Sequence, residues 1–131
     1  MNILLDTHFI LWILTDETKI SKKEKEIIEN SKNSIICSSI SFFEISLKYS
    51  IGKLILEKFS PEDIPDLLLN NGYDIKDISY KTFSTYYKLP NEYHKDPFDR
   101  LLIWEAIQNN YRLLTRDANI KEYESFGLKL L

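Results

Sequence analysis

Short apolar runs alternate with amphipathic stretches along almost the whole chain. Apolar runs of strand length lie at 3–5, 34–37, 112–115 and 128–130. A further strand candidate at 73–78 is the least apolar of the five. The stretches between them predict helices over 8–14, 21–30, 41–51, 60–71, 79–88 and from 96 onward, with a turn and short helix over 117–123. Strands separated by helices imply right-handed crossovers and a mainly parallel sheet. We therefore expect a three-layer α/β/α sandwich around a central sheet of four to five strands.

Several of the predicted helices have recognisable ends. Ser21 and Glu24 form a capping-box pattern at the start of one helix. Asp96 is followed by Pro97, a proline at the first helical position, and the same arrangement occurs at 60–61. Gly52 is placed to end the helix predicted over 41–51. Local sequence and hydrophobic pattern thus agree on the same elements.

Composition limits the chain to one ordinary domain. The 131 residues are 44% hydrophobic and 28% charged, and only 3 Gly and 4 Pro leave little material for linkers. We expect a single domain over 1–131. The net charge of −3 argues against a broad basic surface for duplex DNA. It does not exclude nucleic acid held through metal ions in an acidic pocket.

The single cysteine and the apolar segments bear on where the protein works. Cys37 cannot form an internal disulfide, and its neighbours Ile35 and Ile36 predict a buried thiol. The first 14 residues contain Asp6 and lack a basic leader, so no signal peptide is expected. No apolar run approaches the roughly 20 residues that cross a bilayer. We expect a cytoplasmic protein without membrane contact.

Four acidic residues stand where a predicted strand has just ended or a helix is beginning: Asp6, Glu44, Asp99 and Asp117. Each has a purely structural alternative. Asp6 could cap the following helix, Asp117 could form a turn, and Asp99 could be a first-turn acid. Glu44 could form a capping box with Ser41. However, the predicted topology brings all four to one edge of the sheet, which none of these alternatives requires.

A cluster of carboxylates indicates a divalent-metal site. Like charges close together disfavour ionisation unless a cation compensates. Carboxylate oxygens suit Mg²⁺ or Mn²⁺, and such an ion can bind phosphates and activate water. Hydrolysis of a phosphodiester is the natural reaction at such a site.

The same residues, with their neighbours, resemble the PIN domain and, more narrowly, the VapC-type ribonuclease toxins of type II toxin–antitoxin systems. The similarity spans nearly the whole chain, with the motifs in the same order. They are LLDTH at 4–8, LW at 11–12, SFFE at 41–44, Lys48, GKL at 52–54, HKDPFDRLLI at 94–103 and LTRD at 114–117. It implies a PIN-like fold, a metal-dependent endoribonuclease using Mg²⁺ or Mn²⁺, an RNA substrate, a homodimer and a cognate antitoxin.

The resemblance also suggests roles for individual residues. Asp6 and Asp99 would bind the principal metal ion, and Glu44 and Asp117 would complete the catalytic site. Four further residues would contact metal-bound water or RNA phosphate: Thr7, Thr115, Arg116 and Arg100. Arg100 has the alternative of a solvated surface side chain. Lys48 could either pair with Glu44, one helical turn away, or face the substrate.

Other functions remain open at this point. His8 and His94 could form a metal-free acid/base pair, although a cap or surface contact suits each of them better. Aromatic side chains could stack on bases, but at helical spacing they more often fill a core. A receiver-like phospho-acceptor domain shares the length and an acidic pocket, but it expects adjacent acids after the first strand, where Thr7 and His8 stand here. A noncatalytic acidic binding module is the third possibility.

Overall fold

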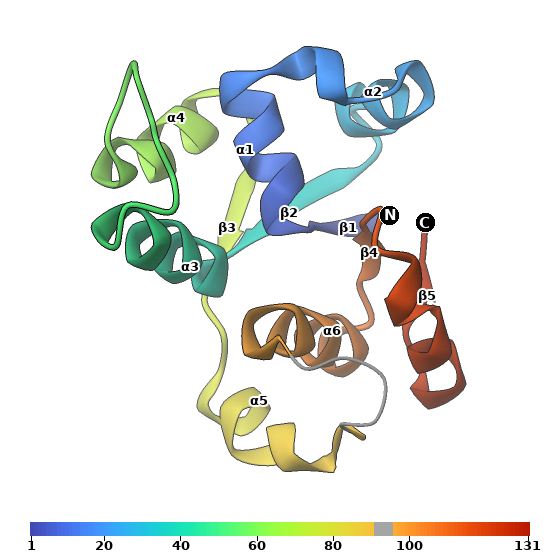
Figure 1. Ribbon diagram of the computed structural model, residues 1–131. Helices are drawn as coiled ribbons and strands as arrows, with labels where there is room; N and C mark the ends of the chain where they lie inside the picture. The colour runs from blue at the N-terminus through green and yellow to red at the C-terminus, as the bar shows by residue number, and fades with distance from the viewer. Residues whose placement is uncertain (91–95) are drawn as a thin grey trace.

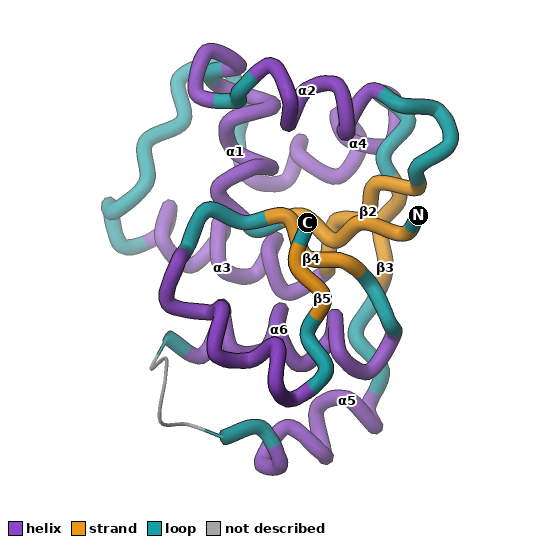
Figure 2. The backbone as a smooth tube through the Cα atoms, turned by 90° about the vertical axis from the view of Figure 1, so that its right-hand side faces the viewer, coloured by secondary structure: helices purple, strands orange, loops and turns teal. Residues whose placement is uncertain are grey.

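A five-stranded, fully parallel sheet forms the centre of the molecule (Figures 1 and 2). The computed structural model describes residues 1–90 and 96–131; His94 and most of the loop predicted over 89–95 lie outside the described residues. The strands are β1 (Asn2–Leu5), β2 (Ser34–Ser38), β3 (Asp74–Lys76), β4 (Arg112–Leu114) and β5 (Lys129–Leu130). Their order is β3-β2-β1-β4-β5. The predicted α/β/α sandwich with a parallel sheet is confirmed.

Helices cover both faces of this sheet. They are α1 (Thr7–Thr15), α2 (Lys22–Glu29), α3 (Ser39–Ser50), α4 (Ile64–Asn70), α5 (Tyr80–Thr85) and α6 (Pro97–Asn109), with 3-10 segments η1 (Glu17–Lys19), η2 (Pro61–Asp63), η3 (Tyr86–Lys88) and η4 (Ala118–Phe126). In Figure 1, α1, α2 and α4 lie on one side of the strands, and α5 and α6 lie on the other. Figure 2 shows the same division from the side, with the strands between the two helical layers.

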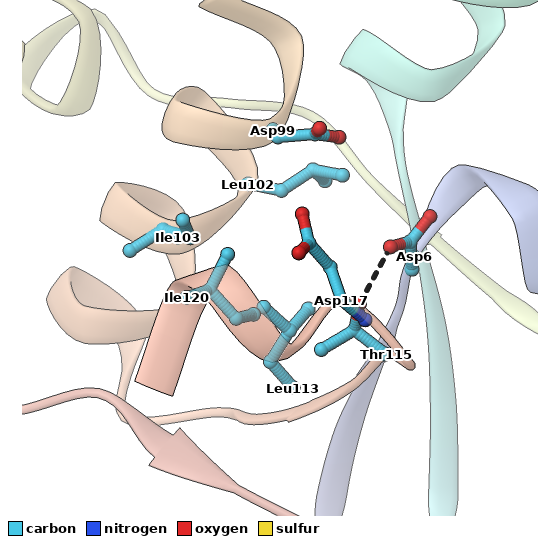
Figure 3. Close-up of a pocket in the computed structure, with 8 residues that line it drawn as sticks. All are labelled: Asp6, Asp99, Leu102, Ile103, Leu113, Thr115, Asp117 and Ile120. Carbon is cyan, nitrogen blue, oxygen red and sulfur yellow. Dashed lines mark hydrogen bonds between the residues drawn. The ribbon is translucent and has the colours of Figure 1, made fainter. Parts of the chain in front are cut away.

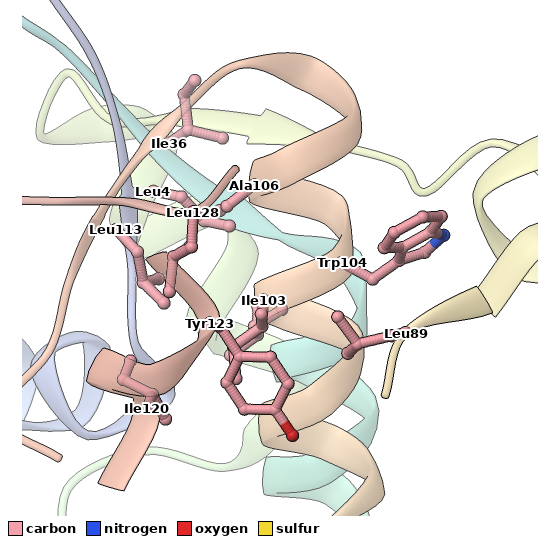
Figure 4. Close-up of a cluster of buried hydrophobic side chains, with 11 residues drawn as sticks. Leu4, Ile36, Leu89, Ile103, Trp104, Ala106, Leu113, Ile120, Tyr123 and Leu128 are labelled. Atoms are coloured by element: carbon pink, nitrogen blue, oxygen red, sulfur yellow. The ribbon is translucent and has the colours of Figure 1, made fainter. Parts of the chain in front are cut away.

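The side chains of the central strand separate two hydrophobic cores. Ile3 and Leu5 pack with Phe9 and Ile10 on the α1 side. Leu4, which points to the opposite face as strand geometry requires, packs in the cluster around α6 and η4 (Figure 4). Cys37 is fully buried, and burial raises the pKa of its thiol to about 12. The prediction of a buried thiol is therefore confirmed.

The helix ends show where local signals were sufficient. Ser21 and Glu24 form the predicted capping box, and the Asp96 side chain accepts from the Phe98 and Asp99 amides at the start of α6. Gly52 adopts a positive φ of 76° directly after α3, a conformation that favours glycine.

Other boundaries were wrong. The helix predicted to start at Ser41 begins at Ser39, with Ser38 as its N-cap, so the alternative of a Ser41–Glu44 capping box is excluded. Ser41 is instead a buried residue inside the first turn. The stretches predicted as single helices over 60–71 and 79–88 each contain a 3-10 segment and a shorter α-helix. Among the described residues, none of the helices is both long and apolar enough to span a membrane.

Candidate active site

The crevice between β1 and β4 is the point from which the sheet is built in opposite directions. β1 connects toward β2 on one side and pairs with β4 on the other. In open α/β sheets, ligands bind outside the carboxyl ends of the strands at such a switch point. Asp6 follows β1 directly, and its amide donates to the Leu114 carbonyl at 3.0 Å. The chain thus places the first acid at the mouth of the crevice.

Asp6 is held in place by three donors. Its Oδ1 accepts from the His8 amide at 2.9 Å and lies 3.3 Å from His8 Nδ1, while its Oδ2 accepts from the Thr115 hydroxyl at 2.7 Å. Asp6 is therefore the N-cap of α1, as one alternative proposed, and it also faces the crevice. Both readings hold at once because one carboxylate oxygen serves each purpose.

Thr115 links the two acids that follow β1 and β4. Its hydroxyl donates to Asp6 and accepts from the Asp117 amide at 3.1 Å. Asp117 also accepts from the Asn119 amide at 2.9 Å and caps η4. The hydroxyl of one residue thus fixes the spacing between two carboxylates.

Asp99 approaches the same crevice from α6. Asp6, Asp99 and Asp117 line one pocket together with Thr115 (Figure 3). In Figure 3 the side chains of Asp6, Asp99 and Asp117 surround the same space. The same three aspartates also line a wider cavity of about 290 Å³, together with residues of α1. The predicted convergence of these three acids is confirmed.

Glu44 is the fourth acid, and it stands apart from that pocket. It is 4% exposed on α3, and its Oε2 accepts from Lys48 Nζ at 2.5 Å. Its Oε1 is buried and has no hydrogen-bond partner among the described residues. Of the two alternatives for Lys48, the structure shows the ion pair one helical turn away.

The charges around these acids compensate one another. Burial alone would raise the pKa of Asp6, but the hydrogen bonds from His8 and Thr115 outweigh it and leave the pKa below its ordinary value. The hydrogen bond to Asp6 raises the pKa of His8, and the negative charges of Glu44 and Asp99 act in the same direction. The hydrogen bond to Glu44 likewise raises the pKa of Lys48, assisted by Asp96 and Asp99. The negative charge of the acids therefore favours the protonated forms of His8 and Lys48, and it attracts cations in general.

Two of the four residues predicted to contact metal-bound water or RNA phosphate are buried. Arg100 is 5% exposed, and its guanidinium donates to the carbonyls of Leu89 and Pro90 and to the hydroxyls of Tyr86 and Tyr123. It is a buried structural residue, neither solvated nor facing RNA. Because successive residues of a helix point about 100° apart, Asp99 can face the crevice while Arg100 faces the interior.

Thr7 is the second correction. It is 4% exposed, and its hydroxyl lies 2.8 Å from the Ser41 hydroxyl. This buried contact joins the first turn of α1 to the first turn of α3, the helix that carries Glu44. Thr7 thus supports the position of an acid and does not reach the solvent side of the crevice.

The carboxylates, as placed, do not form a finished metal cage. Among residues 1–90 and 96–131, no three His, Cys, Asp or Glu side chains are close enough to ligate one ion together. The donor chemistry nevertheless fits a hard divalent ion, since the pocket offers carboxylate and hydroxyl oxygens. The partnerless Oε1 of Glu44 is a buried acceptor to which a cation or its water would supply the missing contact.

Two residues of α1 combine the expected structural contacts with a place in the cavity. His8 is an exposed side chain that contacts Asp6, and it also lines the wider cavity. Trp12 packs against the core and lines the same cavity, with Arg116 over its ring. The signal was present: His8 and Trp12 are four residues apart and therefore share a helix face.

Comparison with known proteins places this geometry in a family. The model of the PIN domain matches residues 3–125. Ribonuclease VapC22 of Mycobacterium tuberculosis is 26% identical over 125 residues, which cover 92% of this chain and 91% of that protein. The solved structure of VapBC2 from Rickettsia felis, bound to a DNA fragment from its promoter, superimposes with a TM-score of 0.73 at 23% identity, covering 100% of this chain and 98% of that one. VapBC-1 from nontypeable Haemophilus influenzae gives a TM-score of 0.64 at 18% identity, covering 100% and 97%.

Proposed function

The chain belongs to the PIN domain family, and from that premise we propose that it is a metal-dependent endoribonuclease, the toxin of a type II toxin–antitoxin pair. Its similarity to a protein named ribonuclease VapC22 and its fold similarity to VapBC structures support this assignment. The proposed partners are an RNA substrate, a cognate antitoxin and a second copy of the chain. The proposed place of action is the cytoplasm.

One observation carries the proposal: three aspartates from separate parts of the sequence line one pocket at the switch point of the sheet. Structural roles explain each aspartate singly, as caps or first-turn acids. They do not explain why a fold would gather these negative charges in one partly buried place. A site for a divalent cation does explain it.

We assign Mg²⁺ or Mn²⁺ to this site, held by Asp6 and Asp99 and completed by Glu44 and Asp117. When bound, the ion would neutralise phosphate charge and lower the pKa of an attacking water. The residues of the chain provide position. Thr115 fixes Asp6 relative to Asp117, and the Thr7–Ser41 contact fixes α3, with Glu44, relative to α1. Arg116 is placed on the cavity wall, where it can contact RNA phosphate.

The test compares three substitutions of the same kind. Asp6→Asn and Asp99→Asn remove one charge each from the pocket, and Asp66→Asn removes one from an exposed position on α4. We expect the first two to lower RNA cleavage by at least about a hundredfold and the third to leave it unchanged. Gel-resolved cleavage of labelled RNA, with and without chelator, measures this. Undiminished cleavage by the Asp99 variant, or in excess chelator, refutes the proposal.

Metal binding can be followed without any cleavage. Mn²⁺ that binds the folded chain raises its melting temperature by mass action. We expect this rise in the wild type and in the Asp66 variant, and its loss in the Asp99 variant. An equal rise in all three proteins would mean that the ion binds elsewhere.

A further inference from the structure

The cavity next to the acids has a second wall of different chemistry. Besides Asp6, Asp99 and Asp117, it is lined by His8, Phe9, Trp12 and Arg116. Flat rings and a flat cation therefore border the same space as the three carboxylates. The cavity is about 290 Å³, which is room for one nucleotide unit and not for a folded segment.

The planar guanidinium of Arg116 is held in one orientation by hydrogen bonds and ring contacts. Its Nε donates to Glu24 at 3.0 Å, and its Nη2 donates to Glu24 and to the Lys19 carbonyl. The guanidinium carbon lies 4.7 Å from the centre of the Trp12 ring and 5.5 Å from that of Phe9. The side chain is still 43% exposed. An arginine held along one edge and stacked on an aromatic ring is preorganised for a ligand.

The unused donors of this arginine are on Nη1. None of the described residues accepts from Nη1, whereas Nε and Nη2 both have acceptors. On the same wall the His8 ring is 65% exposed and lies 5.9 Å from the Trp12 ring. The wall thus offers cationic donors and exposed ring surface at the same place.

We propose that this second wall, formed by His8, Trp12 and Arg116, binds one nucleotide of the RNA beside the phosphodiester that is cleaved. The base stacks on the plane of His8 and Arg116, and Nη1 of Arg116 donates to the phosphate. Stacking on aromatic rings and on guanidinium groups is how proteins hold unpaired bases. This inference rests on the proposed nuclease function, whose acids share the cavity.

An acidic or neutral peptide would use this wall differently from RNA. A peptide needs a run of backbone partners or a long apolar groove, whereas this cavity pairs one cationic plate with three carboxylates. A phosphodiester with a divalent ion satisfies both walls, because the ion meets the carboxylates and the phosphate meets the arginine. Unpaired RNA is therefore the occupant that the charges favour.

Trp12 is a built-in reporter for this site. The chain has two tryptophans, and the other, Trp104, is 8% exposed in the core on the α6 side of the sheet, with its Nε1 donating to Thr85. The variant Trp104→Phe leaves Trp12 as the single indole. We expect oligouridylate and oligoadenylate to quench its emission in the Asp99→Asn background, in which the RNA stays intact.

Arg116→Met is then compared with Arg112→Met. The two variants lose the same charge. Arg112 is exposed at the first position of β4, at the opposite end of the strand from the crevice, so its loss controls for charge alone. We expect the Arg116 change to weaken the RNA-induced quenching by about tenfold and the Arg112 change to have less than about a twofold effect. Equal effects of the two variants, or RNA binding by anisotropy without quenching, would overturn the proposal. Absence of any RNA binding would overturn it as well.

The outcome separates this site from the nuclease function. Wild-type protein that cleaves RNA while Trp12 emission stays constant refutes the nucleotide site alone. Wild-type protein whose Trp12 emission is quenched by RNA that it does not cleave, with or without Mn²⁺, refutes the nuclease function alone. If Trp104→Phe does not fold, irradiation of the unaltered chain with 5-iodouridine RNA replaces it. We then expect crosslinks at His8 or Trp12, and crosslinks confined to other residues contradict the proposal.

Discussion

Two arginines are sequence neighbours of aspartates in the candidate active site, and their surroundings in the structure differ. Arg100 directly follows Asp99 in α6, and Arg116 directly precedes Asp117 after β4. Arg100 is buried and donates to four oxygens at the junction of α6, η3 and η4. Arg116 stays 43% exposed on the wall of the cavity. Adjacent positions in sequence thus led to one structural cation and one that is available to a ligand.

The difference follows from the backbone that carries each residue. On a helix, the step from Asp99 to Arg100 turns the side chain from the crevice into the core. In the extended segment after β4, alternate residues point the same way, so Thr115 and Asp117 share hydrogen bonds near the crevice while Arg116 points away from them toward α1 and α2. An arginine next to a candidate catalytic acid is therefore no sign of substrate contact until its backbone conformation is known.

Removing each arginine gives the sharpest test of this contrast. Arg100→Met leaves two buried carbonyls and two tyrosine hydroxyls without their donor, so we expect the free energy of unfolding to fall by about 4 kcal/mol. Arg116→Met breaks an exposed pair and should lower it by less than about 1 kcal/mol. Urea denaturation of both variants measures the two values. Similar losses would mean that the division into structural and available arginine is wrong.

Glu105 extends the comparison to a buried acid on the Arg100 side. It is 1% exposed, and its Oε1 has no partner among the described residues. Burial raises its pKa to about 7 from an ordinary value of 4.5, although the Ser38 hydroxyl acts in the opposite direction. Between pH 4.5 and about 7, the Glu105 carboxyl therefore keeps its proton in the folded state but has released it in the unfolded state.

The sign of the pH effect follows from that proton. Stability should fall as pH rises from 4.5 through about 7, with a total loss of about 3 kcal/mol above that range. Glu105→Gln cannot ionise, so we expect it to match the wild type near pH 4.5 and to exceed it in stability at pH 8. Urea titrations across this range decide the matter. A wild type whose stability is flat between pH 5 and 8 would show that Glu105 is not held neutral.

The fold was predictable because its signals are local and repeated. Apolar runs such as 3–5 and 34–37 favour buried strands, and Asp96 with Pro97 favours the start of a helix; the structure shows both. The convergence of Asp6, Asp99 and Asp117 followed from parallel topology alone, since the acids come at strand or helix ends.

Features set by tertiary partners were not predictable in this way. Ser41 and Glu44 have the spacing of a capping box, but the N-cap of α3 is Ser38. Ser41 instead contacts Thr7, which lies 34 residues earlier in the sequence. The burial of Arg100 depends on acceptors at Leu89, Tyr86 and Tyr123, which no spacing around Arg100 announces. The pairing of Arg116 with Glu24 spans 92 residues for the same reason.

A smaller loss of stability is expected at Thr115, the residue before Arg116. Thr115→Val keeps the shape but removes the hydroxyl that joins Asp6 to the Asp117 amide. We expect cleavage to fall by about tenfold because two carboxylates lose their fixed spacing, with a stability loss of about 1 kcal/mol. Thr115→Ser, which keeps the hydroxyl, should retain most of the activity. Equal kinetics for the valine and serine variants would show that the hydroxyl does not position the acids.

The smallest expected effect lies at the partner of Arg116. Glu24→Gln can keep Oε1, which accepts from the Ser21 amide, but it removes the charge and replaces Oε2, the acceptor of Arg116 Nε, with an NH2 group that cannot accept. The hydrogen bond from Arg116 lowers the pKa of Glu24 to about 2 from 4.5, so the wild-type pair stabilises the fold above pH 4.5 and loses this contribution as pH falls toward 2. Since Arg116 is 43% exposed, solvent screening limits the difference between variant and wild type at pH 7 to less than about 1 kcal/mol. RNA affinity should change more than stability, because a guanidinium released from Glu24 no longer keeps its plane on Trp12. A variant that loses several kcal/mol and binds RNA normally would place Arg116 with Arg100 among the structural cations.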